Sequence, residues 1–311
     1  MQHTLGIDVS KDRLEAHALG TGAARSFSND RAGIARLVRW LTALGQPLVV
    51  FEATGIYTRA LERGLAARAL AFHKVNPLRA RRFAEGCGRL AKTDRVDAEM
   101  LARMGAALAL PAQEPTPGNL AELKDLLAAR RGLACDLARE RGRVRAAVSA
   151  LLRRLALMRV RLLERQLARI DATIAGRIAA DPAFARRAEI LASIPGIAAV
   201  TVAEFVIDMP ELGAMSGKEA ASTAGLAPMA RQSGKFRGQA HIRGGRPGLR
   251  RALYMPALVA MRCNPPLRAK AERLAGRGKP PKVVITAVMR NLIVLANTLI
   301  AEDRLWQPER P

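Results

Sequence analysis

The chain has 311 residues, half of them apolar, and a formal net charge of +24. This length allows two or three folded domains, and the apolar content excludes a largely disordered protein. So large a surplus of Lys and Arg indicates a polyanionic partner, most simply nucleic acid. A membrane surface is not favoured, because no isolated basic amphipathic helix is present.

Three further features predict a cytoplasmic protein. The cysteines are odd in number and scattered, which is typical of reduced thiols and not of a zinc site. Gln2 and His3 lead directly into strand-like sequence, without the pattern of a signal peptide. The most apolar run, 283–301, is interrupted by Arg290 and two Asn residues, so it predicts a buried helix and not a membrane span.

The first region, residues 1–112, alternates between strand and helix patterns. The predicted strands are 4–10, 13–19, 25–29, 47–53 and 70–75. The predicted helices are 31–44, 55–69 and one that includes 94–104. A hairpin followed by alternating strands and helices predicts an α/β domain, with a mixed sheet and helices on its faces.

The second region, 113–185, is predicted to be helical. It follows a Pro-rich linker, 111–119. Apolar or small residues then recur at spacings of three and four over about six heptads, from Leu120 to Leu162. The pattern predicts a long helical hairpin or a coiled coil, and it leaves open whether the seam lies within one chain or between two copies.

The third region, 186–311, is predicted to be mainly helical. Its sequence "IPGI" contains Pro195 and Gly196 between two apolar helical stretches, as in a helix-hairpin-helix element. Backbone amides at such a turn can hold a phosphate. An ordinary tight turn between helices has the same pattern, so the phosphate contact is a hypothesis.

The third region also contains a stretch of one charge sign. No Asp or Glu occurs between Glu219 and Glu272, whereas ten Lys or Arg residues do. A Gly-rich loop of this kind is typical of a segment that lies along a phosphate backbone. The candidate nucleic-acid-binding residues in it are Arg231, Lys235, Arg237, Arg243, Arg246, Arg250 and Arg251.

Four acidic residues predict a metal site. Asp8 lies inside an apolar strand, and Glu52 ends another. Asp94 and Asp97 are three residues apart and share one face of a helix. A carboxylate within an apolar strand is costly unless it is paired or bound to a metal. Hard carboxylate oxygens suit Mg²⁺ or Mn²⁺, although a solvated helix face would also explain the last two.

Six motifs together resemble a known family. They are "GIDVSKD", "FEATGIY", "KTDRVDAEMLA", "IPGI", "AGLAPMARQSGKFRG" and "GRPGLRRALY". In this order they are similar to the DEDD transposases of bacterial insertion sequences, a family that includes the Piv-type DNA invertases and the bridge-RNA-guided recombinases. The resemblance covers about residues 3–110 and 186–265.

The resemblance implies a RuvC-like, RNase H-type fold for the first region. It implies that Asp8, Glu52, Asp94 and Asp97 are the metal-binding acids, and that Ser233 is a nucleophile that cuts and rejoins DNA. The implied partners are donor and target DNA duplexes, a structured guide RNA and further copies of the chain in a dimer or tetramer. The implied location is the bacterial cytoplasm, in association with the nucleoid.

Two alternatives remain open from the residues. A RuvC-like hydrolytic nuclease would use the four acids but would not need Ser233. A non-catalytic basic nucleic-acid-binding protein would need neither. A covalent protein–DNA adduct distinguishes the first alternative from a recombinase, and a metal titration distinguishes the second.

Overall fold

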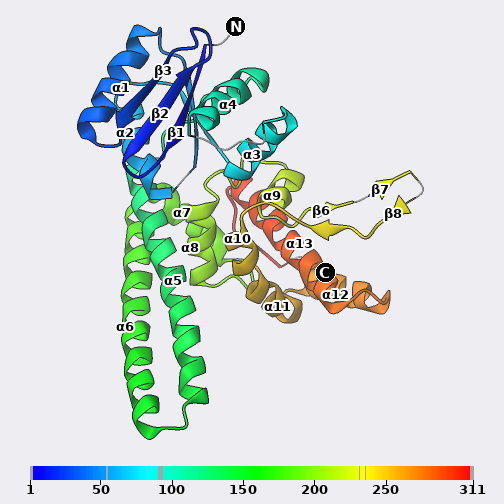
Figure 1. The fold of residues 1–311 in the computed structure, drawn as a ribbon. Helices are drawn as coiled ribbons and strands as arrows, with labels where there is room; N and C mark the ends of the chain where they lie inside the picture. Colours follow the sequence, from blue (N-terminus) through cyan, green and yellow to red (C-terminus); the bar gives the residue numbers. More distant parts are fainter. Residues whose placement is uncertain (1–2, 54, 90–93, 231, 235, 309–311) are drawn as a thin grey trace. The chain divides into compact units, whose positions relative to one another are not determined.

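The computed structural model describes residues 3–53, 55–89, 94–230, 232–234 and 236–308 (Figure 1). The chain divides into two compact units, Met1–Pro117 and Gly118–Pro311. The first contains a mixed five-stranded sheet with helices, and the second is mostly helical. The helical segment that follows the linker is part of the second unit and does not form a unit of its own.

The sheet of the first unit has the strand order β3-β2-β1-β4-β5. The strands are β1 (Thr4–Val9), β2 (Arg13–Ala18), β3 (Ala24–Ser28), β4 (Leu48–Glu52) and β5 (Phe72–Val75). The first three are antiparallel, whereas β4 pairs in parallel with both β1 and β5. All five predicted strands are therefore present.

Each face of this sheet has its own apolar core. On one face, Leu5, Ile7 and Phe51 pack with residues of α1 (Arg31–Ala43) and α2 (Arg59–Ala66). On the other, Val50 packs with residues of α3 (Pro77–Gly86) and α4 (Asp94–Ala107). The sequence analysis did not predict α3, although Asn76 before Pro77 is a start signal: its side chain accepts a hydrogen bond from the amide of Leu78 at 2.9 Å.

Helix α4 lies directly on β1. A Cβ added to Gly6 would lie 1.9 Å from the carbonyl oxygen of Ala98 and 2.6 Å from the amide nitrogen of Ala102. The hydroxyl of Thr4 donates to the carbonyl of Ala102 at 2.9 Å. Glycine is therefore required at position 6, because any side chain would lift the helix off the strand.

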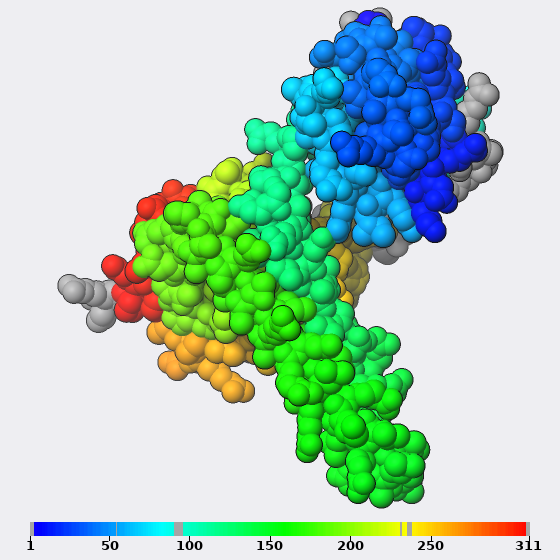
Figure 2. All heavy atoms as spheres, turned by 90° about the vertical axis from the view of Figure 1, so that its left-hand side faces the viewer, coloured from blue at the N-terminus to red at the C-terminus, as the bar shows by residue number. Residues whose placement is uncertain are grey.

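The second unit begins with a pair of long antiparallel helices, α5 (Gly118–Ala146) and α6 (Ala150–Ala180) (Figure 1). In the space-filling view their distal part projects from the rest of the unit (Figure 2, green). The predicted seam thus lies, at least in part, within one chain. Arg130 of α5 binds Asp171 of α6 at 2.5 Å, and Arg141 binds Glu164 at 2.8 Å. Near the body of the unit, Arg131 pairs with Glu204 and Asp208.

The heptad pattern does not make a continuous buried seam. Leu120, Leu123 and Leu127 are buried, and they pack with the main core of the second unit. The later members of the pattern are exposed: Val148, Leu151, Leu155, Met158 and Leu162. The distal part of the helical pair therefore presents apolar side chains to solvent.

The remaining helices surround one apolar core. They are α7 (Pro182–Ala192), α8 (Ala199–Asp208), α9 (Gly217–Thr223), α10 (Pro247–Ala252), α11 (Tyr254–Cys263), α12 (Pro265–Gly276) and α13 (Pro281–Ala301). By length and composition, α13 could cross a membrane, and 44% of its apolar window is buried inside the protein. Its residues from Val284 to Leu299 supply much of the core, as expected for a buried helix.

A β-arm, residues 228–242, connects α9 to α10. Near its base, β6 (Pro228–Met229) pairs with β9 (His241–Ile242). Further out, β7 (Gln232–Ser233) pairs with β8 (Phe236–Arg237). Figure 1 shows the arm reaching away from the helices of its own unit.

Candidate catalytic site and nucleic-acid interface

Asp8 and Glu52 lie on neighbouring parallel strands at the same end of the sheet. The pairing of β1 with β4 reaches Ile7 and Phe51, and each acid follows by one residue. Both side chains are partly buried. Side chains alternate along a strand, so Asp8 shares the face of Gly6, which α4 covers. The two acids therefore lie at one sheet edge, where loops of α/β folds bind ligands.

Asn29 connects the two loops that follow these strands. Its side-chain amide donates to the carbonyl of Ser10 at 2.8 Å and to the carbonyl of Tyr57 at 3.0 Å. Ser10 follows β1, and Tyr57 follows β4 in the short helix η1 (Gly55–Thr58). One side chain thus fixes the backbone beyond both acids, and the sequence analysis did not single it out.

The other two acids belong to the first turn of α4. The helix starts at Asp94, and Asp97 is partly buried. The side chain of Asp94 lies outside the described residues. Within the described part of the chain, no three His, Cys, Asp or Glu side chains form a group that could hold a metal. The four-acid site that includes Asp94 therefore stays a prediction.

Ser233 lies at the far end of the β-arm. It ends β7, opposite Phe236, and its side chain is exposed. Gly234 follows with φ +55°, as hairpin turns of this length require. Lys235 and Arg231 lie outside the described residues, as does the side chain of Arg237. The serine belongs to the second unit, whereas the four acids belong to the first.

Two of the predicted phosphate-binding residues hold the base of the arm. Arg250 donates to the carbonyl oxygens of Gly225 at 3.3 Å and Gly244 at 3.2 Å. Arg246 donates to the carbonyl of Asp208 and to the Glu211 carboxylate. Burial tends to raise the pKa of Glu211, but the contact with Arg246 and its charge hold that pKa below its ordinary value.

The base of the arm is also closed by two glycines. Gly225 and Gly245 have φ values of +70° and +63°. A Cβ on Gly245 would lie 2.2 Å from the amide nitrogen of Gly225. The two ends of the arm therefore touch backbone to backbone, which only glycine allows.

Arg243 and Arg251 differ from Arg246 and Arg250. Both side chains are exposed. Among the described residues, neither forms an ion pair with a carboxylate. These two guanidinium groups are thus available to an external anion, whereas Arg246 and Arg250 already bind groups of the protein.

The Pro195–Gly196 turn joins α7 to α8, as predicted. Gly196 has φ +102°, and a Cβ there would lie 2.9 Å from the carbonyl oxygen of Pro256 in α11. Both turn residues are partly buried. Ala198, which precedes α8, offers no side-chain cap to the amides of that helix, so those amides can accept another partner.

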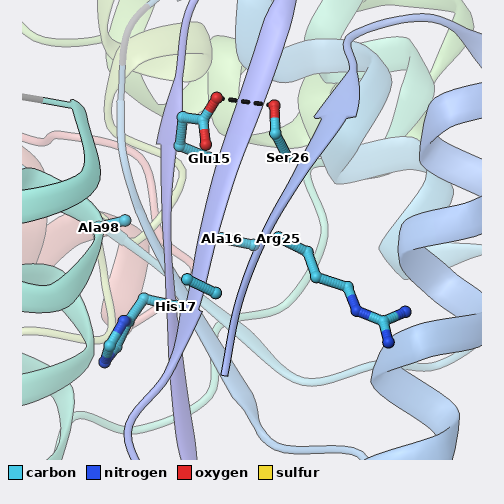
Figure 3. A pocket seen from close by; sticks show the side chains of 7 residues that line it. Glu15, Ala16, His17, Arg25, Ser26 and Ala98 are labelled. Atoms are coloured by element: carbon cyan, nitrogen blue, oxygen red, sulfur yellow. Dashed lines mark hydrogen bonds between the residues drawn. The ribbon is translucent and has the colours of Figure 1, made fainter. Parts of the chain in front are cut away.

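A polar row that the sequence analysis missed crosses the sheet beside Asp8. Glu15 on β2 lies directly opposite Asp8, and Ser26 on β3 lies directly opposite Glu15. The Ser26 hydroxyl donates to the Glu15 carboxylate at 2.7 Å (Figure 3). The short turn between β1 and β2 could have revealed this row, because the register of a hairpin follows from the length of its loop.

The chain is similar to transposases and DNA invertases along most of its length. Residues 5–152 match a family model described as "Transposase", and residues 188–272 match one described as "Transposase IS116/IS110/IS902 family". The pilin gene-inverting proteins of Moraxella bovis and Moraxella lacunata are each 31% identical to it, over 96% of both chains. An uncharacterized 42 kDa protein of the insertion element IS900 from Mycobacterium paratuberculosis is 31% identical over 40% of this chain and 32% of its own.

Proposed function

Because the chain belongs to the IS116/IS110/IS902 family of transposases and is a DNA recombinase, we propose that it cuts and rejoins DNA with Ser233 as nucleophile. The proposed site is completed by Asp8, Glu52, Asp94 and Asp97, which bind Mg²⁺ or Mn²⁺. The observation that carries this proposal is the position of Asp8 and Glu52 on adjacent parallel strands, at the edge beside α4. The first unit is then an RNase H-like domain of the RuvC type.

The packing of α4 on β1 supports a convergence of the four acids. Thr4 contacts Ala102, and Gly6 contacts Ala98. A step of two residues along β1, about 6.6 Å, therefore corresponds to a step of four residues along α4, about 6 Å. One more step in the same direction pairs Asp8 with Asp94. Their carboxylate oxygens suit a hard divalent cation.

A bound divalent cation would stabilise the negative charge that develops on the scissile phosphate. The protein's own contribution is to hold DNA and to supply the nucleophile. The Ser233 oxygen loses its proton and attacks phosphorus, and a DNA hydroxyl leaves with a proton. The serine–phosphate ester keeps the energy of the broken bond. Attack by a hydroxyl of another DNA end then reverses the reaction and releases the serine.

The basic stretch supports DNA binding by phosphate contacts. Arg243, just after β9, and Arg251, in α10, are both exposed, and they would contact the DNA backbone without reading bases. Arg231, Lys235 and Arg237 flank Ser233 in the sequence and would hold the scissile phosphate. The amides beyond Pro195 and Gly196 at the start of α8 would bind a further phosphate.

The assembly we propose is a dimer or tetramer that holds donor and target duplexes together in the bacterial cytoplasm, on nucleoid DNA. Exposed apolar side chains on α6, such as Leu151, Leu155 and Met158, support contact with a second copy. We also propose that a structured RNA selects the DNA sites. The charge of +24 supports a second polyanion in the complex.

The test is a suicide DNA substrate nicked beside the crossover point. In Mg²⁺ the wild-type protein should become covalently attached to DNA, and Ser233→Ala should not. Ser233→Cys should keep partial attachment, because a thiolate also attacks phosphorus. If Ser233→Ala recombines DNA at the wild-type rate, the serine is not the nucleophile. DNA cleavage without an adduct or rejoining would favour the hydrolytic nuclease.

A further inference from the structure

Glu15 has a specific geometric relationship to one of the proposed metal-binding acids. It is the cross-strand partner of Asp8 on the antiparallel neighbour. Residues directly opposite each other point to the same face, with Cβ atoms about 4.5–5.5 Å apart. Asp8 has Glu52 on its other side, at the same sheet edge. Asp8 therefore lies between two carboxylate-bearing strands.

The Glu15 side chain is held in place. The hydroxyl of Ser26 donates to one carboxylate oxygen at 2.7 Å, and Ser26 is itself the cross-strand partner of Glu15. Figure 3 shows the two side chains joined across the strands, at a cavity that Ala98 of α4 also lines. Helix α4, which carries Asp94 and Asp97, thus borders the same space as Glu15.

The charge of Glu15 is not offset within the described part of the chain. No Lys or Arg there forms an ion pair with it. The cation on β3, Arg25, stacks on Trp40 at 5.4 Å from the ring centroid, and Figure 3 shows it pointing away from Glu15. Like charges directly opposite each other on two strands destabilise a sheet. A cation that binds at Asp8 would remove this cost.

We propose that Glu15 is a positioning residue of the acidic site, which acts through Asp8 and raises its affinity for a divalent cation. This inference rests on the proposed function, because it requires the metal site of the four acids. Glu15 does not need to touch the ion. Its charge, fixed by Ser26 one strand away, adds to the negative potential at Asp8 and makes the empty site less stable.

The experiment measures thermal unfolding of the full-length protein in EDTA and along a titration with MnCl₂. A ligand that binds only the folded state raises the melting temperature. For Glu15→Gln, the MnCl₂ concentration that gives the half-maximal shift should rise on the order of tenfold. In EDTA, the same variant should melt at or above the wild-type temperature, because one repulsion is gone. A purely structural residue would lower the melting temperature under both conditions.

Three variants serve as controls. Glu15→Asp keeps the charge and should restore most of the affinity. Ser26→Ala frees the carboxylate and should weaken binding by a smaller factor than Glu15→Gln does. Glu85→Gln removes an equal charge from the exposed ion pair with Arg81 on α3 and should leave the midpoint unchanged.

The outcomes separate this inference from the function on which it rests. If the wild-type protein shows a manganese-dependent shift and Glu15→Gln shows the same midpoint, the role of Glu15 is refuted and the metal site stands. If Glu15→Gln does not fold, an unchanged midpoint in Ser26→Ala refutes it. If the wild-type protein shows no shift, the metal site itself is refuted, and the role of Glu15 with it.

Discussion

The guanidinium group of Arg250 in α10 donates to the carbonyl oxygen of Gly225 at 3.3 Å, which ties this helix to the segment where the chain leaves α9 for the β-arm. The same group donates to Gly244 on the returning side of the arm at 3.2 Å. An arginine that the sequence analysis placed in a basic, Gly-rich loop thus lies in a helix and binds the protein's own backbone, at the base of the segment that carries Ser233.

Arg250→Ala should therefore loosen the arm. We expect faster amide hydrogen exchange over residues 226–245 and a greater loss of adduct formation than of DNA affinity, because removal of the side chain leaves two carbonyl groups without their donor. Hydrogen exchange by mass spectrometry and a DNA-binding assay on the same variant measure the two effects. If DNA affinity and adduct formation fall equally and amide hydrogen exchange is unchanged, Arg250 instead contacts a DNA phosphate.

Arg251→Ala should have the opposite profile. Its side chain is exposed on the same helix, so the arm should remain ordered while affinity falls for all DNA sequences alike. The slope of log affinity against log salt should become less negative by about 0.9 per lost phosphate contact. A titration series over salt concentration gives the slope, and an unchanged slope would remove Arg251 from the interface.

Asp97→Asn should abolish adduct formation with little loss of DNA affinity. The amide keeps the size of the side chain but removes the charge that the proposed cation requires. Adduct yield in Mg²⁺ and affinity in EDTA are the two measurements. Normal adduct yield in this variant would place the metal site, if present, elsewhere in the protein.

Gly6→Ala should unfold the first unit or strongly destabilise it. The new Cβ would overlap the backbone of Ala98, which cannot move without the rest of α4. We expect a loss of at least about 3 kcal/mol in unfolding free energy, measured by urea denaturation. Gly86→Ala at the end of α3 is the matched control, since nothing lies within 4 Å of its added Cβ. A tolerated Gly6→Ala would contradict the close packing of α4.

The contact between Glu211 and Arg246 should make stability depend on pH in the acidic range. The folded state lowers the pKa of Glu211 below its ordinary value. Its contribution to stability is thus complete above that ordinary value and is lost as the pH falls through the folded-state pKa. Glu211→Gln should flatten the curve of unfolding free energy between about pH 6 and pH 3. Identical curves for the variant and the wild type would argue against this contact.

The sequence predicted the strands of the first unit well because their pattern is local. Alternation placed Asp8 inside the first strand, and the apolar run before Glu52 placed that residue at the end of another. The sequence also contained the register of β1 and β2, since a short turn follows Asp8, yet Glu15 was overlooked because it lies in an otherwise ordinary alternating strand. Helix α3 was missed although Asn76 and Pro77 mark its start.

Tertiary contacts decided the features that the sequence left open. Leu127 and Leu155 occupy equivalent positions of one heptad pattern, but only Leu127 meets the core of the second unit. Likewise, the sequence does not distinguish Arg246 from Arg251, because both lie in the stretch that contains Lys and Arg but no Asp or Glu. The proximity of Glu211 to Arg246 depends on how α8 and α10 pack, which no local pattern encodes.

The start of α5 and the end of α6 are joined: the side chain of Asn119 donates to the carboxylate of Asp181 at 2.9 Å. The 29 residues of α5 and the 31 residues of α6 therefore form a helical hairpin whose two ends lie next to each other. The length of this hairpin can vary without displacing the chain segments before α5 and after α6. Removing matched turns on both sides of residues 147–149 would shorten the pair by about 1.5 Å per residue. Insertions and deletions at this tip should thus change the reach of the helical pair while the rest of the second unit stays intact.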